Sequence, residues 1–145
     1  RDRIGISIGV ALAHRGDGKL IVDIQPDGDL LFDPGALWTV ANQKLPMLLV
    51  MYNNRAYYND WEHQLRIADR RGTDKEKAYI GMDLSDPAPD FAMLAKSFGW
   101  YSEGPIEDPK DVGSALRRAI EVIRKEGRPA LLDTIVRKRE LTRFR

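Results

Sequence analysis

Two short polar segments carry the residues that could do chemistry in this chain of 145 residues. Residues 26–29, with the sequence PDGD, follow one apolar run, and residues 53–56, with the sequence NNRA, follow another. Each run has the composition of a buried strand, with one helix-like stretch between them. Because the carboxyl ends of parallel strands meet at one edge of a sheet, Asp27 and Asn54 are predicted to lie close together.

This pair of side chains suits a divalent cation that also holds phosphate. A carboxylate and an amide oxygen are hard ligands, and Mg2+ is usually held by one or two carboxylates together with phosphates of the ligand. A backbone carbonyl after Asn54 could add a third ligand, and Gly28 would let the backbone approach a phosphate closely. Asp-Gly and Asn-Asn are also ordinary turn pairs, so the signal lies in their joint placement.

The remaining sequence predicts the elements that position these segments. We expect strands at residues 20–24, 47–52, 100–102 and 130–136, and helices at residues 4–13, 33–44, 57–70, 91–98 and 109–126. The first helix is rich in small residues and is expected to be buried. Asp33, Asp90 and Asp108 are expected helix N-caps, and Gly127 is expected to end the last helix. This alternation predicts an α/β domain on a mainly parallel sheet with helices on both faces.

The composition excludes several classes of protein. Hydrophobic residues make up 43%, charged residues 31%, and the formal net charge is +1, so no overall field favours nucleic acid. No apolar run is long enough for a membrane span, and no signal peptide is visible in the given residues. The absence of cysteine excludes disulfides and thiolate metal sites and fits a reducing compartment, so we expect a cytoplasmic protein with no nucleic-acid or membrane partner. We expect one domain at residues 1–137 and a basic tail at residues 138–145.

At this point the sequence shows a family resemblance. The stretch from Ile21 to Asn54 resembles the diphosphate-binding motif of thiamine-diphosphate enzymes, which is Gly-Asp-Gly, some two dozen residues, and then Asn-Asn. Residues 4–13, 90–99 and 127–131 resemble other parts of the same family in matching order. Within this family, the sequence resembles acetolactate synthase and benzoylformate decarboxylase. The resemblance implies the thiamine-diphosphate-binding fold of a C-terminal, diphosphate-binding domain, truncated at its N-terminal edge.

The resemblance also implies the roles of individual residues. Magnesium would be bound by Asp27, Asn54 and the carbonyl of Ala56, and thiamine diphosphate would be contacted by Gly28, Asp29, Asn54, Tyr57 and Tyr58. No catalytic residue is expected in this chain.

Three positions depart from the family pattern. Pro26 replaces the first glycine and removes an amide donor. Asp29 stands where serine or alanine is common, and Tyr58 stands where glycine is frequent. The literal Gly-Asp-Gly at residues 16–18 precedes its strand instead of following it, and the residue that lies 27 positions after Asp17 is a lysine. We expect that segment to be a plain turn.

The resemblance implies a larger enzyme around this chain. A pyrimidine-binding domain, upstream or on another subunit, would carry the glutamate that activates the cofactor. We expect a homo-oligomeric lyase or transferase that decarboxylates or carboligates a small 2-oxo acid or a related donor. One alternative is a non-catalytic, degenerate interaction module with the same fold. Another is a flavodoxin-like or other phosphate-binding α/β protein, whose ligand binding would survive a chelator.

Overall fold

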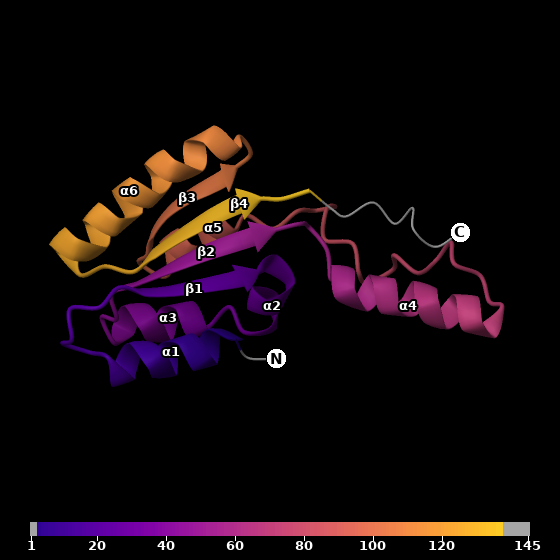
Figure 1. Ribbon diagram of the computed structural model, residues 1–145, viewed down its shortest axis with the longest axis horizontal. Coiled ribbons are helices and arrows are strands. Elements are labelled where there is room, and N and C mark those ends of the chain that lie inside the picture. The colour runs from indigo at the N-terminus through magenta and orange to yellow at the C-terminus, as the bar shows by residue number, and fades with distance from the viewer. Residues whose placement is uncertain (1–2, 138–145) are drawn as a thin grey trace.

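Four strands form one all-parallel sheet in the computed structural model, which describes residues 3–137 (Figure 1). The strands are β1 (Ile21–Pro26), β2 (Met47–Asn53), β3 (Tyr101–Ile106) and β4 (Ala130–Ile135), in the spatial order β1-β2-β4-β3. The helices are α1 (Arg3–Ala13), α2 (Asp27–Phe32), α3 (Ala36–Asn42), α4 (Tyr58–Arg71), α5 (Phe91–Ser97) and α6 (Pro109–Glu126). The predicted α/β class is therefore confirmed.

Helices cover both faces of the sheet, as expected. Side chains that alternate along β2 face opposite ways, because successive residues of a strand point to opposite faces. Leu49 and Met51 join a core with α1, α2, α3 and α5. Leu48 joins a second core with the apolar stripe of α6, which includes Ala119 and Ile123. β2 lies between two strands and two cores, which explains why its sequence is almost entirely apolar.

Three of the predicted helix boundaries are confirmed. The Asp90 carboxylate accepts a hydrogen bond from the Met93 amide at 2.7 Å, and the Asp108 carboxylate accepts one from the Lys110 amide at 2.9 Å. Gly127 ends α6 in the left-handed conformation, with φ +65°. These caps satisfy backbone groups that the helix ends leave without partners.

The predicted N-cap at Asp33 is wrong. Helix α2 begins at Asp27, directly after β1, and Asp33 closes that helix by donating its amide to the Leu30 carbonyl at 3.2 Å. Helix α3 then begins at Ala36, with Gly35 as an N-cap that forms no side-chain hydrogen bond. Because residues 27–32 already form a helix, the Asp-Pro pair serves the junction between two helices instead of opening one.

The expectation that the first helix is buried is also wrong. Ile4 and Ala11 are buried, but Ile6 is 71% exposed and Val10 and Leu12 are also exposed. A Cβ added at Gly9 would meet nothing within 4 Å, so its small size serves no close packing within the described residues. Helix α1 therefore buries one face only.

β1 forms one edge of the sheet. Val22 pairs with Leu48 and Ile24 with Val50, so their side chains lie on the face of the sheet that α6 covers. Helix α6 extends over β2, β4 and β3 but not over β1, and Val22 and Ile24 remain 48% and 64% exposed.

Helix α4 extends past the carboxyl ends of the strands, away from the body of the sheet (Figure 1). The segment that follows α4 returns to the residues just before this helix, where Ala56 forms an isolated antiparallel bridge with Asp83. The Tyr57 amide donates to the Met82 carbonyl at 2.8 Å beside it. No helix within residues 3–137 is long and apolar enough to cross a membrane. The predicted basic tail at residues 138–145 lies outside the described residues.

Candidate functional site at the carboxyl edge of the sheet

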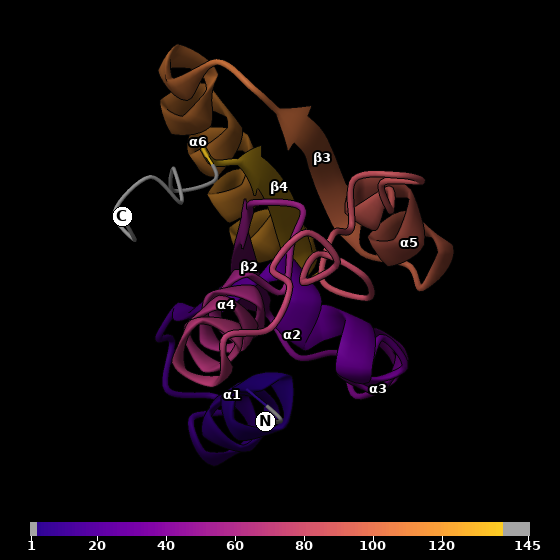
Figure 2. The same ribbon diagram turned by 90° about the vertical axis from the view of Figure 1, so that its right-hand side faces the viewer.

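The two segments singled out in the sequence meet at the carboxyl edge of the sheet, where α2 and the first turn of α4 lie side by side (Figure 2). Pro26, the last residue of β1, pairs with Tyr52 of β2. Together the two segments line a pocket of about 390 Å³. Its lining residues are Pro26, Gly28, Asp29, Tyr52, Asn54, Ala56, Tyr57, Tyr58, Asn59 and Asp60. The sequence prediction that the two strand ends come together is confirmed.

Asp27 lies between the lining residues Pro26 and Gly28 and is completely buried, so it is not itself part of the pocket wall. Its Oδ2 accepts a hydrogen bond from the Ala56 amide at 3.2 Å. Its Oδ1 is buried and has no hydrogen-bond partner among residues 3–137. Burial raises the pKa of this carboxyl, while backbone hydrogen bonds, including that of Ala56, lower it. A buried carboxylate oxygen without a partner costs free energy, so it fits a site that a cation completes.

Asn54 approaches the same point from β2. Its Oδ1 accepts a hydrogen bond from the Ala56 amide at 2.9 Å, so the side chains of Asp27 and Asn54 converge on one N–H group. Arg55, which lies between Asn54 and Ala56 in the chain, has a positive φ of 56°, and this turns the loop sharply. The three predicted ligand residues Asp27, Asn54 and Ala56 are thus brought together by hydrogen bonds.

The donor set at this position is chemically narrow. Among residues 3–137 no three His, Cys, Asp or Glu side chains gather in a way that could hold a metal ion. Any cation at Asp27 would therefore be bound by one carboxylate, supplemented by amide and carbonyl oxygens. Such an all-oxygen set, with positions left for phosphate oxygens, suits Mg2+ better than a transition metal.

Gly28 is needed for a close approach within the chain itself. A Cβ at this position would lie 2.6 Å from Cδ1 and 2.7 Å from Cε1 of Tyr57. The Tyr57 ring also packs against Phe32, with 5.5 Å between the ring centroids. Gly28 thus allows an aromatic side chain to lie across the start of α2, a use that the sequence did not indicate.

The pocket carries negative charge. Asp29 and Asp60 line it, and none of the described residues that line it is a lysine or arginine. The pKa of Tyr57 is raised by burial first and then by the charges of Asp27, Asp29 and Asp60. An anionic ligand would be repelled here unless a cation bound with it.

Asn53 and Asp133 are site residues that the sequence analysis missed. The Asn53 Nδ2 donates to the Asp133 Oδ1 at 3.0 Å, and both side chains are buried. Burial raises the pKa of Asp133 to about 6, with further increases from the charges of Asp27 and Asp90 and opposing effects from Asn53 and Arg55. The available signal was one acidic residue within the apolar run of the last strand.

The literal Gly-Asp-Gly segment lies at the opposite end of β1. Asp17 is exposed and accepts a hydrogen bond from His14 Nδ1 at 2.8 Å, with Lys19 Nζ at 3.6 Å. The Asp17 amide donates to the His14 carbonyl at 3.1 Å, which closes a turn. The prediction that this segment is a plain turn is confirmed.

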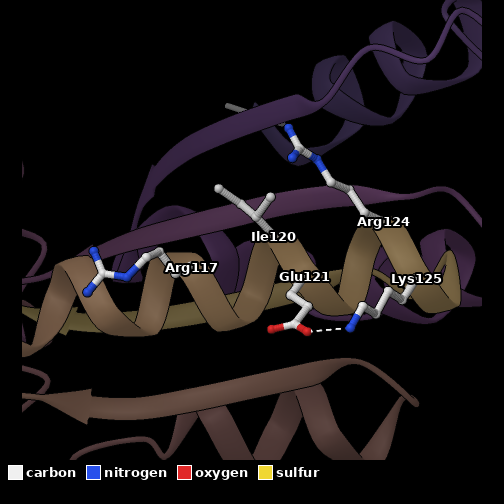
Figure 3. Close-up of a pocket in the computed structure, with 5 residues that line it drawn as sticks. All are labelled: Arg117, Ile120, Glu121, Arg124 and Lys125. Carbon is white, nitrogen blue, oxygen red and sulfur yellow. Dashed lines mark hydrogen bonds and ion pairs between the residues drawn. The ribbon is translucent and has the colours of Figure 1, made fainter.

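Another hollow, of about 420 Å³, lies along α6 and is formed by side chains of that helix alone (Figure 3). Ile120 points toward the sheet between Arg117 and Arg124. Lys125 donates to Glu121 at 2.6 Å, an ordinary pair one helical turn apart. The four charged side chains of this hollow are exposed, so it offers no buried polar group comparable with Asp27.

Fold and site together define a parallel α/β domain with a pocket beyond the carboxyl ends of the strands, where ligands usually bind in such sheets. A sequence model of the family described as "Thiamine pyrophosphate enzyme, C-terminal TPP binding domain" matches residues 3–134. The chain belongs to this family, and the resemblance found in the sequence is confirmed.

Individual relatives agree with this assignment. The chain is 29% identical over 136 residues to a candidate acetolactate synthase large subunit of Mycobacterium tuberculosis, covering 91% of this chain and 24% of that protein. It is 28% identical over 134 residues to the acetolactate synthase large subunit of Pyropia yezoensis, covering 92% of this chain and 20% of that protein. The chain thus spans about a quarter or less of the length of these relatives.

A solved structure shows the same fold. Benzoylformate decarboxylase from Polynucleobacter necessarius superposes with a TM-score of 0.71, covering 94% of this chain and 23% of that chain. The sequence identity is 18%, so the likeness concerns the fold.

Proposed function

We propose that this chain anchors the diphosphate of thiamine diphosphate through a magnesium ion bound by Asp27, Asn54 and the carbonyl of Ala56. The observation that carries the proposal is the buried Oδ1 of Asp27, which has no hydrogen-bond partner among residues 3–137. A bound cation would supply the missing interaction and would favour the ionised carboxylate. Membership of the thiamine-pyrophosphate-binding family supports the same cofactor.

The charges around the pocket favour a cation-dependent mode of binding. Gly28, Asp29, Tyr57 and Tyr58 line the space beside Asp27 and would border the diphosphate. Because Asp29 adds a carboxylate and the described lining contains no lysine or arginine, the ion must offset the repulsion between protein and ligand. Cofactor binding should therefore be negligible without a divalent ion.

The departures from the family pattern affect the neighbourhood of the ligand and not the metal ligands themselves. Pro26 has no N–H group to offer, and it continues the extended backbone of β1 with φ −75° and ψ 156°. Tyr58 lines the pocket at the first residue of α4. These positions should tune affinity while Asp27 and Asn54 provide the anchor.

The complete protein would be a thiamine-diphosphate-dependent lyase or transferase that acts on a 2-oxo acid or a related donor. The relatives named acetolactate synthase and benzoylformate decarboxylase support this class. When bound, the cofactor supplies the carbon–carbon bond chemistry, and this chain's residues bind and orient its diphosphate. A pyrimidine-binding domain, on the same polypeptide or on another subunit of an oligomer, would complete the site.

Calorimetry on the complete protein tests the anchor. Thiamine diphosphate is titrated into the protein with excess Mg2+, and again with a chelator in place of the ion. We expect saturable binding with Mg2+ and no measurable heat of binding with the chelator. Equal binding under both conditions would show that the cation assignment is wrong.

The alternative function is a non-catalytic interaction module that keeps the fold. The departures at Pro26, Asp29 and Tyr58 favour it, because they alter the surface that would face the cofactor. Such a module would not bind thiamine diphosphate at millimolar concentration, with or without Mg2+. The same titration therefore separates the two functions.

A further inference from the structure

The fold makes room for a buried acid behind the proposed cation site. Asp133 of β4 is 1% exposed. Opposite it, the pairing of β3 with β4 is irregular between Glu103 and Ile106, so the strand bulges away. A Cβ at Gly104 would lie 2.6 Å from the Cβ of Asp133 and 2.9 Å from its carbonyl oxygen, and Gly104 has φ +145°. Burying a carboxyl group is costly, so its partner is informative.

That partner is Asn53, at the carboxyl end of β2. Its Nδ2 donates to Asp133 Oδ1 at 3.0 Å, and the Asn53 carbonyl accepts from the Val136 amide at 2.9 Å. Both ends of the Asn53 residue are thus held by β4 and the residue that follows it. With its amide nitrogen committed to Asp133, the side-chain oxygen must point the other way.

The oxygen of Asn53 shapes the loop that carries the proposed ligands. It accepts a hydrogen bond from the Arg55 amide at 3.0 Å, which closes a turn around Asn54. Arg55 is held at φ +56°, a left-handed conformation that is strained for a non-glycine residue. If the Asn53 amide rotated by half a turn, its NH2 group would face the Arg55 N–H and this bond would be lost.

Ala56 links this turn to the proposed metal ligands. The Ala56 amide, one position after the turn, donates to Asn54 Oδ1 and to Asp27 Oδ2. A change in the Arg55 turn would therefore move both Asn54 and the Ala56 carbonyl relative to Asp27. The path runs from Asp133 to Asn53 to the loop, with each step a direct hydrogen bond or a peptide linkage.

We propose that Asp133 is a positioning residue, which fixes the Asn53 amide and thereby holds Asn54 and Ala56 in place around a divalent cation. This inference rests on the proposed function for its consequence, although the geometry of the loop is independent of it. Partners that orient metal ligands without touching the metal typically change metal affinity by 10- to 100-fold.

The test uses the complete protein with Mn2+ as the probe. Free Mn2+ is measured by electron paramagnetic resonance in the presence of saturating thiamine diphosphate, which gives the Kd without any activity assay. We expect Asp133→Leu to raise the Kd roughly 10- to 100-fold. Asp133→Asn keeps an acceptor oxygen for Asn53 and should restore the Kd to within about threefold of the wild type.

Thr134→Val is the matched control. Thr134 is the neighbouring buried residue of β4, and its hydroxyl donates across the sheet to the Met51 carbonyl. Its loss removes a buried hydrogen bond between the same two strands without touching the loop. We expect a Kd equal to that of the wild type.

A second variant and a second measurement separate the possible failures. Asn53→Ala breaks the path from Asp133 to the loop at its middle, and it should weaken Mn2+ binding as Asp133→Leu does, with no further loss in the double variant. Amide hydrogen exchange without cofactor should be faster at Arg55 and Ala56 in both variants. Wild-type Mn2+ binding that is retained by folded Asp133→Leu and Asn53→Ala would overturn the positioning role alone. If the wild type fails to bind Mn2+, the proposed function falls, and unchanged exchange at Arg55 would then overturn this inference as well.

Discussion

The two ends of β1 each carry an aspartate beside a glycine, and the two aspartates differ in burial and in the partners of their carboxylates. At the amino end Asp17 is exposed, and His14 and Lys19 satisfy its carboxylate. At the carboxyl end Asp27 is completely buried, and one of its oxygens has no partner among residues 3–137. The amino end has the more familiar sequence, Gly-Asp-Gly, and the carboxyl end has the more informative surroundings. Whether an Asp-Gly motif can form a binding site thus depends on the end of the strand at which it lies.

The surroundings of the two aspartates also differ in charge. The hollow at the amino end, of about 590 Å³, contains several basic side chains. It is lined by Ala11, His14, Arg15, Gly16, Gly18, Lys19, Ile21, Gln43, Lys44 and Pro46. The pocket at the carboxyl end contains Asp29 and Asp60 instead. The acidic pocket is the one that a cation would complete, because its described lining contains no lysine or arginine and the neighbouring Asp27 has a buried oxygen without a partner among residues 3–137.

The largest difference between the two ends should appear in cofactor binding. We expect Asp27→Ala to weaken Mg2+-dependent binding of thiamine diphosphate to the complete protein roughly 100-fold or more, since it removes the only charged ligand proposed. Asp17→Ala should leave the Kd within about twofold, because that carboxylate contacts only exposed side chains. Calorimetry on both variants measures the contrast, and similar losses in the two would contradict it.

The pH dependence of stability should distinguish the buried acids at the carboxyl end from the exposed Asp17 at the amino end. Because the pKa of Asp133 is raised from 3.8 to about 6, the folded chain keeps a proton there at pH values at which the unfolded chain has already released it. The contribution of Asp133 to the free energy of unfolding should therefore fall by about 3 kcal/mol as the pH rises from roughly 4 to 6, and should stay constant above that.

Asp133→Asn removes this contribution, while the raised pKa of Asp27 retains a fall of the same sign. Urea denaturation of the chain at several pH values measures both slopes. Parallel curves for the wild type and the variant would show that Asp133 does not titrate in this way.

The glycines at the two ends should respond to alanine for different reasons. Gly28→Ala is expected to cost about 1–3 kcal/mol, because the new methyl group would overlap the Tyr57 ring. In a Tyr57→Ala background the same change should cost much less. Gly18 has φ +68° and open space around it, so Gly18→Ala should cost about 1 kcal/mol from backbone strain, with Gly18→Asn less costly. A Gly28 penalty that persists without Tyr57 would contradict the steric explanation.

The smallest effect should come from the ion pairs at the amino end. Asp17→Asn removes contacts with His14 and Lys19, all of them exposed, so the free energy of unfolding should change by less than about 0.5 kcal/mol. Thermal unfolding in low and high salt provides the measurement. A loss above 1 kcal/mol would mean that this turn holds the start of β1 more firmly than its exposure suggests.

Much of the architecture could be predicted from local sequence. The apolar runs locate the strands, because a strand buried on two faces must be apolar throughout. Helix α2 was missed because Asp-Gly-Asp is typical of a turn, and the six-residue helix gains its stability from the burial of Leu30. The exposed face of α1 was missed because small and apolar residues suggest burial wherever they occur.

The site was predictable only in part. Asp27 and Asn54 follow strands directly and Ala56 lies two residues after Asn54, so their meeting follows from the parallel sheet. The Asn53–Asp133 pair joins residues 80 positions apart, and no local pattern specifies which strands become neighbours. Whether a cation binds at Asp27 remains a prediction.

The bare edge of the sheet has a practical consequence for protein engineering. Val22 and Ile24 present apolar side chains on a strand that, among residues 3–137, pairs on one side only, a combination that promotes strand-to-strand aggregation. Threonine at these two positions would keep the preference for extended backbone while making the exposed surface less hydrophobic. When the chain is expressed by itself, its solubility would therefore depend on two side chains that have no part in the ligand pocket.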